Sequence, residues 1–383
     1  MALALFEAAN VYFIMPMPGS QRLPSVDVAY FLHTWRWAIR ALFGTTAIMT
    51  LVHVWRAGGW RRIAAVFAIA SVGVITFAAN YVMPADRMFL QPRVLTMVGA
   101  AQNAVDTARL VVGTVVGGEA RAYPIQFIGY HHQVRDSIGG RPVMVSYCTV
   151  CRTGRVFVPL VDGKLETFRL VGMDQFNAMF EDASTGSWWR QANGEAITGP
   201  LKGTTLAELP SWQVSLGQWL SLHPASLVMQ PDPAFVGPYG SSYDFESGAS
   251  RSELTGTDTV SWNQKAWVVG LTVNGASRAY DWNRLKRERV VNDTLGGAPV
   301  VVVLTRGDKG FFAFRRPDIS TRFTLEGDTL RSGRVAYALN GAPIPASRVG
   351  QASTAAPEGL EPLQASQEFW HSWRTFQPAT SRY

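Results

Sequence analysis

The two cysteines of the chain are the residues whose type and spacing most directly suggest chemistry. Cys148 and Cys151 form a Cys-x-x-Cys motif directly after a β-branched run that predicts a buried strand. Two intervening residues let both sulfur atoms converge, so the pair can close as a disulfide or present two thiolates to one metal ion. The motif therefore leaves three hypotheses open: a structural disulfide, a redox-active pair and a soft-metal site.

Each hypothesis draws on neighbouring residues. His131 precedes the motif by one turn and one strand, and two thiolates with its imidazole suit Cu(I) or Zn²⁺. Zinc prefers a fourth ligand, for which His132, His223 or water are candidates. A redox-active pair would instead profit from the nearby cations of Arg152 and Arg155, which favour a thiolate. A disulfide across so short a ring would restrain the unfolded chain little.

A second group of polar residues lies further along the chain. Glu181 and Asp182 precede a run of serine, threonine and glycine that ends at Trp188 and Trp189. Such a group can serve as an acid/base or ligand loop, but it is more typical of an Asx-type turn anchored by the tryptophans. No G-x-S-x-G, Walker loop or His-Glu-x-x-His occurs, so nothing supports a hydrolase or nucleotide-binding function. Whether the protein is an enzyme stays open.

Two apolar segments near the N-terminus predict a membrane hairpin within residues 30–90. The run 63–83 carries no charge and is long enough to cross a hydrocarbon core of roughly 30 Å. The stretch 31–55 has the length for a first span, but its first half holds a histidine and two arginines that must pair or reach the interface. Residues 1–29 contain two prolines and an acid in their apolar part, and we expect an interfacial segment there.

Charge and composition limit the partners. Charged residues make up 16% of the chain, below the roughly 25% of ordinary soluble domains, and hydrophobic residues make up 47%. No Lys/Arg run of nucleic-acid type occurs, so the net charge of +7 indicates attraction to the lipid bilayer rather than to nucleic acid. Arg56, Arg61 and Arg62 surround the connection between the two predicted spans, which favours a cytoplasmic loop with both ends outside.

The large remainder resembles itself at a shift of 157 residues. Residues 121–123 and 278–280 both read Arg-Ala-Tyr, and strand, glycine-turn, helix and tryptophan patterns recur in the same order. We therefore predict a strand-rich α+β fold, internally duplicated, with a first repeat at 105–230 and a second at 260–383. The second repeat has no sulfur at 305–310, where the first carries its cysteines. The chemistry is expected where the repeats differ.

Several motifs resemble a bacterial and archaeal family known as domain of unknown function 3179. The resemblance covers roughly residue 111 to the C-terminus. Its carriers include His131 to Asp136, Tyr147-Cys148-x-x-Cys151-x-Thr153, Ser187-x-Trp189-x-Gln191 and Trp219-x-x-x-His223-Pro224.

The resemblance implies an extracytoplasmic domain, anchored here by the two spans. It also implies a site at five positions: His131, Tyr147, Cys148, Cys151 and Thr153. In the metal hypothesis both thiolates and His131 are ligands, while Tyr147 and Thr153 surround them.

The sequence thus predicts a protein of the bacterial inner membrane with its large C-terminal domain on the periplasmic side. Its expected function is copper or zinc binding, or thiol redox chemistry, at the Cys-x-x-Cys motif. The alternative is a non-catalytic accessory subunit of a membrane protein complex, in which the cysteines form a structural disulfide.

Overall fold

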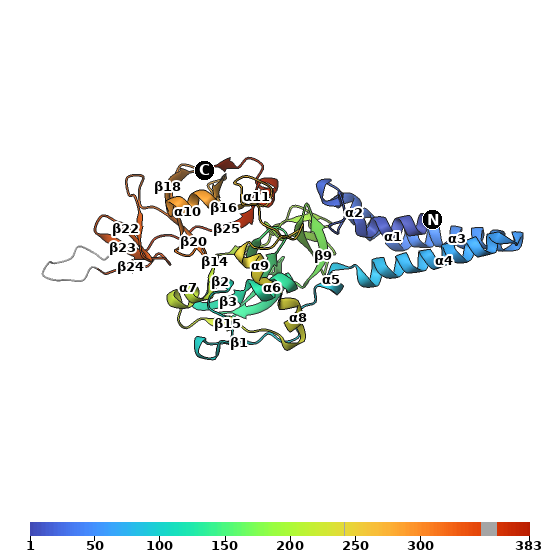
Figure 1. Cartoon of the computed structure of the whole chain (residues 1–383), viewed down its shortest axis with the longest axis horizontal. Helices are drawn as coiled ribbons and strands as arrows, with labels where there is room; N and C mark the ends of the chain where they lie inside the picture. Colours follow the sequence, from blue (N-terminus) through green and yellow to red (C-terminus); the bar gives the residue numbers. More distant parts are fainter. Residues whose placement is uncertain (241, 346–357) are drawn as a thin grey trace. The chain divides into compact units, whose positions relative to one another are not determined.

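The computed structural model describes residues 1–240, 242–345 and 358–383 (Figure 1). Contacts divide the chain into two compact units, each made of two segments. Unit 1 consists of residues 1–91 and 160–206, and unit 2 of residues 92–159 and 207–383. The predicted first repeat is therefore interrupted, because its middle segment groups with the N-terminal helices. The predicted strand-rich α+β class is confirmed by short helices and antiparallel sheets in both units.

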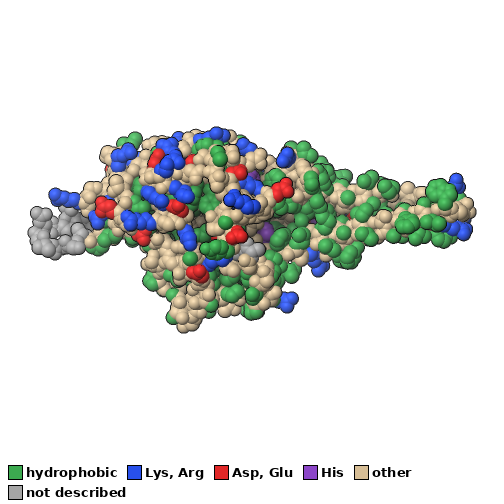
Figure 2. All heavy atoms as spheres, viewed as in Figure 1, with side chains coloured by type: hydrophobic (Ala, Val, Ile, Leu, Met, Phe, Trp, Pro, Cys, Tyr) green, Lys and Arg blue, Asp and Glu red, His purple; other side chains and the backbone are tan. Residues whose placement is uncertain are grey.

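The N-terminal part of unit 1 is helical. Its helical elements are α1 (Ala2–Tyr12), η1 (Ser20–Arg22), α2 (Val26–Thr34), α3 (Arg36–Ala57), α4 (Trp60–Phe77), the π-helical η2 (Ala78–Val82) and α5 (Ala85–Met88). Two helices, 36–57 and 60–82, are long and apolar enough to cross a membrane. Apolar side chains such as Phe67 and Val74 are exposed on this pair, which carries much apolar surface (Figure 2). The first of these helices begins at Arg36 rather than near residue 31, because α2 ends before Trp35.

One polar cluster joins three of these helices. Arg40 on α3 donates to both carboxylate oxygens of Glu7 on α1, at 2.7 and 2.8 Å, and to Oδ1 of Asn80 at 2.6 Å. The Asn80 amide donates to the same carboxylate at 2.9 Å. An arginine in an apolar helix is tolerated when it is paired in this way. Glu7 is therefore the partner of Arg40, one of the two arginines in the first predicted span that were expected to pair or to reach the interface.

Unit 1 also contains an antiparallel sheet of order β12-β11-β10-β9. Its strands are β9 (Phe168–Asp174), β10 (Asn177–Asp182), β11 (Trp188–Arg190) and β12 (Ala196–Thr198), and a small hairpin, β7 (Leu160–Val161) and β8 (Lys164–Leu165), precedes them. Ala29 of α2 packs with Val171, Met179 and Trp188 in a small core. Close approach matters at Gly172, where a Cβ would lie 2.2 Å from the carbonyl oxygen of Ile14.

Unit 2 begins with two sheets joined by a short helix. The first has the order β1-β15-β3-β2-β14, and the second the order β13-β6-β5-β4. Their strands are β1 (Met97–Val98), β2 (Leu110–Val116), β3 (Glu119–Pro124), β4 (Gln133–Ile138), β5 (Arg141–Cys148), β6 (Thr153–Phe157), β13 (Glu208–Leu209), β14 (Ser211–Ser215) and β15 (Leu227–Met229). The helical elements of this part are η3 (Ala100–Gln102), α6 (Ile125–His131), α7 (Leu216–Leu222), η4 (Pro233–Phe235), α8 (Val236–Tyr239) and α9 (Ser242–Ser247).

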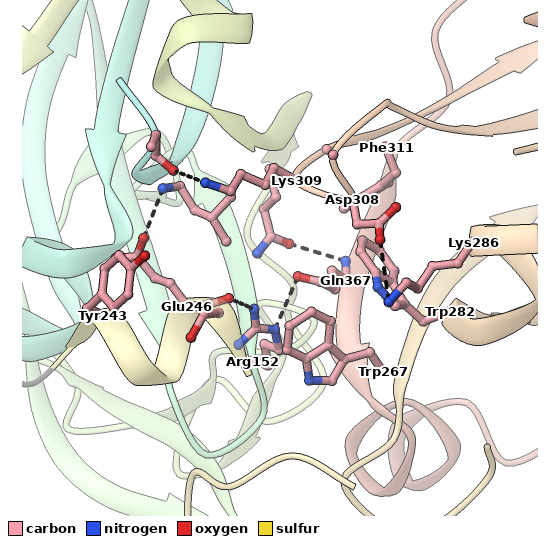
Figure 3. A pocket seen from close by; sticks show the side chains of 16 residues that line it. Arg152, Tyr243, Glu246, Trp267, Trp282, Lys286, Asp308, Lys309, Phe311 and Gln367 are labelled. Carbon is pink, nitrogen blue, oxygen red and sulfur yellow. Dashed lines mark hydrogen bonds and ion pairs between the residues drawn. The ribbon is translucent and has the colours of Figure 1, made fainter. Parts of the chain in front are cut away.

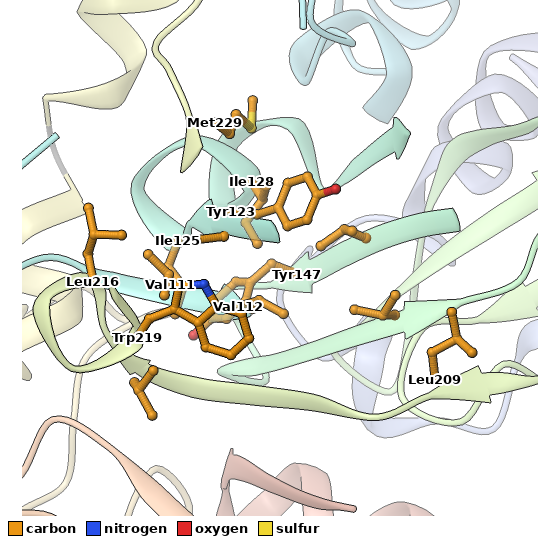
Figure 4. Packing of buried hydrophobic residues seen from close by; sticks show 14 of the residues in the cluster. Val111, Val112, Tyr123, Ile125, Ile128, Tyr147, Leu209, Leu216, Trp219 and Met229 are labelled. Carbon is orange, nitrogen blue, oxygen red and sulfur yellow. The ribbon is translucent and has the colours of Figure 1, made fainter. Parts of the chain in front are cut away.

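The apolar core of this part lies between the sheets and their helices. Val111, Val112, Tyr123, Tyr147 and Trp219 are all buried in it (Figure 4). Alternate residues of β5, namely Val143, Val145 and Tyr147, face this core because successive strand side chains point to opposite faces.

The C-terminal part of unit 2 has a closely similar plan. It contains a sheet of order β25-β16-β17-β26, the helix α10, a sheet of order β18-β19-β20 and the helix α11, which precedes the last strand β26. The bounds are β16 (Trp267–Val273), β17 (Ala276–Asp281), α10 (Trp282–Glu288), β18 (Val290–Leu295), β19 (Ala298–Leu304), β20 (Phe311–Arg315), β25 (Ala365–Phe369), α11 (Trp370–Phe376) and β26 (Ser381–Arg382). A further small sheet holds β21 (Thr324–Glu326), β22 (Thr329–Ser332), β23 (Val335–Ala338) and β24 (Pro343–Ile344).

In each part of unit 2, the ring of one tryptophan packs directly on a glycine. A Cβ at Gly113 would lie 2.4 Å from the ring of Trp219, and one at Gly270 would lie 2.2 Å from the ring of Trp373. Gly113 lies in β2 and Gly270 in β16, where only a residue without a side chain lets the indole cover the strand.

We expect Gly113→Ala to destabilise unit 2 by about 1–3 kcal/mol, because the methyl group overlaps a buried indole that has no space to move into. The thermal unfolding midpoint of the full-length protein measures the effect. Gly237→Ala is the control, because no atom lies within 4 Å of a Cβ built there. Equal midpoints for the two variants would contradict the close packing of Trp219.

Candidate functional site

The Cys-x-x-Cys motif forms the turn of a hairpin between β5 and β6. Cys148 is the last residue of β5 and pairs with Thr153, the first of β6, so four residues make the connection. Both cysteines are fully buried, are present as thiols and lie 3.4 Å apart. The predicted strand before the motif is present, and the turn brings the two sulfur-bearing residues together.

Strand β25 and helix α11, more than 200 residues further along the chain, hold the backbone of this turn. The amide of Phe369 donates to the Cys151 carbonyl oxygen at 2.9 Å. Nε2 of His371 lies 3.2 Å from the carbonyl oxygen of Val150, and because a carbonyl can only accept, Nε2 carries the proton. Burial lowers the pKa of His371 to about 4, so the imidazole is neutral at pH 7.

A buried ion pair fixes the strand that follows the turn. Arg155 donates to Glu368 at 2.7 Å and to Glu208 at 3.1 Å. Glu368 also accepts from Thr153 at 3.3 Å and from Ser372 at 2.8 Å. Thr153 therefore has a defined role: it ties the first residue of β6 to the carboxylate.

Arg152 occupies the last position of the turn with a left-handed backbone, at a φ of 59°. Its guanidinium is fully buried and lies 3.6 Å from the centre of the Trp267 ring. It donates to the carbonyl oxygens of Phe245 and Glu246, at 2.7 and 2.8 Å, and to Oε1 of Gln367 at 3.2 Å. Burial lowers the pKa of Arg152 to about 10, so it remains a cation at pH 7.

Tyr147 precedes the motif and is fully buried against Phe245, with ring centres 6.1 Å apart. Burial raises the pKa of Tyr147, and the neighbouring Arg152 cation opposes this only in part. The phenol is therefore neutral at physiological pH and acts as a packing residue beside the thiols.

The histidines of the metal hypothesis make other contacts. Nε2 of His131 is 2.6 Å from the hydroxyl of Tyr239, and the His131 ring packs on Phe235. His132 has a left-handed backbone, and burial lowers its pKa to about 4. His223 packs against Trp219 with ring centres 4.2 Å apart and the rings tilted by 40°. Within the described part of the chain, no group of three or more His, Cys, Asp or Glu side chains is placed to hold a metal ion.

The sequence did not single out Glu368, Gln367 and His371, which complete the surroundings of the turn. One signal was available at Glu368. A 154-residue shift that superposes the two tryptophan helices pairs this acid with Val214, so a carboxylate replaces an apolar residue in a buried strand.

Glu181 and Asp182 lie in unit 1 and are held by other groups. Asp182 accepts from the Thr185 amide at 2.6 Å, the Ser187 amide at 3.1 Å and the Trp189 indole at 2.8 Å, so the expected Asx-type turn is present. Glu181 accepts from Arg169 at 2.7 Å, and its other bonds come from the Trp188 indole and His33. Both carboxylates are thus saturated by structural donors.

A comparison with protein-family models identifies the family of the chain. The family described as a protein of unknown function (DUF3179) matches residues 90–380. The chain belongs to this family. The DUF3179 region begins just after α5 and contains the Cys-x-x-Cys turn, the strand and helix that hold it, and the Asx turn of unit 1. Comparisons with curated proteins and with solved structures found no significant match.

We expect Glu368→Gln to destabilise unit 2 by about 3–5 kcal/mol, because it leaves the buried Arg155 without its closest carboxylate. Glu361→Gln is the matched control: it breaks the exposed pair with Arg315, which is worth about 0–1 kcal/mol. Denaturant unfolding of both variants measures the difference. If the two lost equal stability, the Arg155–Glu368 pair would not be anchoring the turn.

The stability of unit 1 should depend on Glu181 in acid. Burial opposes its ionisation, but bonds from His33, Arg169 and Trp188 prevail and lower the pKa of Glu181 from 4.5 to about 2. Its stabilising contribution is therefore full above pH 4.5 and is lost as the pH falls towards 2. Thermal midpoints at pH 6 and pH 3 should differ less in Glu181→Gln than in the wild type. Glu195→Gln controls for the substitution itself, and an unchanged pH dependence in Glu181→Gln would show that the carboxylate stabilises nothing.

Proposed function

We propose that Cys148 and Cys151 act as a reversible thiol–disulfide pair in a membrane-anchored protein. The observation that carries the proposal is the placement of the two thiols, 3.4 Å apart in a four-residue turn. The backbone of that turn is fixed from outside by Phe369 and His371. A fixed turn keeps the sulfur atoms within bonding reach of each other, which a thiol pair needs in order to exchange electrons rapidly.

The reaction we propose is a two-electron exchange with a disulfide of a protein or a small molecule. One thiolate attacks a sulfur of the substrate disulfide, which forms a mixed disulfide and releases one substrate thiol. The second cysteine then attacks the mixed disulfide and releases the other thiol. The pair ends as a disulfide, and its two electrons reside on the reduced substrate. We expect the cation of Arg152, the residue next in the chain to Cys151, to favour the thiolate that starts the exchange.

The contacts of the histidines support thiol exchange over copper or zinc binding. The predicted third ligand, His131, is bound to Tyr239, and the described residues offer no cluster of three suitable side chains around a metal. Two thiols by themselves suffice for redox chemistry. Metal binding at Cys148 and Cys151 remains a hypothesis that the experiment below distinguishes.

The two long apolar helices support anchoring in the bacterial inner membrane. Arg56, Arg61 and Arg62 lie around the short connection between them, which favours a cytoplasmic connection and a periplasmic body. A periplasmic location suits the proposal, because disulfides form and persist in that compartment.

We further propose that the body arose by internal duplication. The strand orders of the two parts of unit 2 correspond, and each part bonds a buried tyrosine to an aspartate 13 residues later. The Tyr123 hydroxyl donates to Asp136 at 2.6 Å, and the Tyr280 hydroxyl donates to Asp293 at 2.9 Å. If so, either the first copy gained the two cysteines after the duplication, or the second copy lost them.

A redox titration of the full-length protein in detergent tests the proposal. Samples are equilibrated with thiol buffers from roughly −120 to −320 mV, quenched in acid, unfolded and labelled with a maleimide for intact-mass measurement. We expect both cysteines to change together, with a midpoint between about −120 and −230 mV, the range of thiol-exchange proteins. The Cys148→Ser variant keeps only the Cys151 thiol, which cannot form the internal disulfide, so it should gain one maleimide label at every potential.

Two outcomes would contradict thiol exchange. A pair that stays oxidised below about −300 mV would be a structural bridge, as in the accessory-subunit alternative. Thiols that resist labelling in the native protein until a chelator is added would indicate copper or zinc.

A further inference from the structure

A cavity of about 280 Å³ lies inside unit 2, where its two similar parts meet (Figure 3). It is separate from the thiols, which do not line it, although Arg152 is part of its wall. Ligand sites in proteins range from about 300 to 1,000 Å³. The size of this cavity therefore suits a small molecule.

Corresponding positions of the two parts contribute to the wall. Arg152 and Lys309 are 157 positions apart in the sequence, and both line the cavity. Gln213 and Gln367 are 154 positions apart, the shift that superposes the two tryptophan helices, and both line it as well. The cavity thus presents a cation and an amide from each part to the same space.

One of these amides has an unused donor. Gln213 is only 6% exposed, and its Oε1 accepts from the main-chain N–H of Gln367 at 3.2 Å. Its Nε2 is buried and has no hydrogen-bond partner among the described residues. A buried donor without a hydrogen-bond partner destabilises the folded protein by about 1–3 kcal/mol. An acceptor atom on a ligand in the cavity would remove that cost.

Among the described residues, Arg152 and Lys309 of the wall form no ion pair with a carboxylate, although the charge of Glu246 acts on Arg152 from a longer distance. Arg152 donates only to two main-chain carbonyls and an amide oxygen, and Lys309 donates to the carbonyl oxygen of Ala108 at 3.0 Å. None of the salt bridges in the described chain involves either residue. Arg152 is buried and Lys309 is exposed. A buried cation such as Arg152 is most stable with a negative charge nearby, and the Lys309 cation adds to the attraction for an anion.

The carboxylates of the wall already have partners. Glu246 pairs with Arg109 at 2.6 Å, and Asp308 pairs with Arg289 at 2.5 Å and with Lys286 at 3.4 Å. The wall itself contains three cations, Arg152, Lys286 and Lys309, against the two acids. The excess of one positive charge matches a monoanion such as a carboxylate better than a phosphate dianion.

The remaining wall is largely aromatic, with Trp267, Trp282 and Phe311 on one side and Tyr243 on the other (Figure 3). We propose that this cavity binds a small organic molecule that carries one carboxylate on an apolar body. The carboxylate accepts a hydrogen bond from Nε2 of Gln213 and lies near Arg152 and Lys309. The apolar body packs on the aromatic rings. This site is independent of the proposed thiol reaction.

Calorimetric titration of the full-length protein in detergent tests the site with benzoate, benzamide and inorganic phosphate as probes. We expect benzoate to bind. The neutral benzamide should bind at least about tenfold more weakly, because a charged acceptor makes the stronger hydrogen bond. Phosphate should also bind at least about tenfold more weakly, because it has no apolar body to pack on the aromatic rings. Benzamide or phosphate binding as tightly as benzoate, or no benzoate binding at all, would overturn the proposal.

The variant Gln213→Leu tests whether benzoate binds in this cavity. The variant removes the unused donor and should weaken benzoate binding about tenfold. Gln218→Leu, on α7 outside the cavity wall, should bind benzoate like the wild type. If Gln213→Leu folds and binds benzoate unchanged, the cavity is not the site. If it does not fold, Lys309→Gln with Lys164→Gln as control decides in the same way.

Discussion

The ion pair between Arg155 and Glu368 joins the two parts of unit 2 at the place where the thiols lie. Burying two charges is costly unless each is fully hydrogen-bonded. That condition is met at Glu368, which accepts from Arg155, Thr153, Ser366 and Ser372. Because Phe369, the next residue, donates to Cys151, the position of this carboxylate also determines where the thiol turn is held.

Arg152 adds a second link of the same kind. A non-glycine residue with a left-handed backbone is uncommon and needs support from its surroundings. The support here comes from its side chain, which is enclosed by the rings of Trp267 and Phe245 and bonded to three oxygens. The same guanidinium forms part of the cavity wall. One residue therefore stabilises the thiol turn and contributes charge to the neighbouring space.

Local patterns in the sequence predicted the local features. The long apolar helices, the strand before Cys148 and the Asx turn at Asp182 each depend on a few adjacent residues. Features that depend on distant contacts were not accessible in this way. The grouping of residues 160–206 with the N-terminal helices and the burial of Glu368 both follow from packing between segments far apart in the chain. For Glu368 the only sign in the sequence was a charged residue at the position that corresponds to the apolar Val214. The spacing of the residues did not indicate that Arg155 is its partner.

The two corresponding turns of unit 2 are held differently, and the difference bears on their chemistry. In the turn at 305–310, Asp308 forms ion pairs with Arg289 and Lys286 of the same part, and a single side-chain bond, from Lys309 to the carbonyl oxygen of Ala108, reaches the other part. The thiol turn is instead held by β25 and α11 of the other part. Its two thiols are buried, so a substrate can reach them only when these contacts between the parts loosen. The thiol exchange that we propose would therefore be coupled to the packing of one part against the other, and the cavity lies at that same boundary.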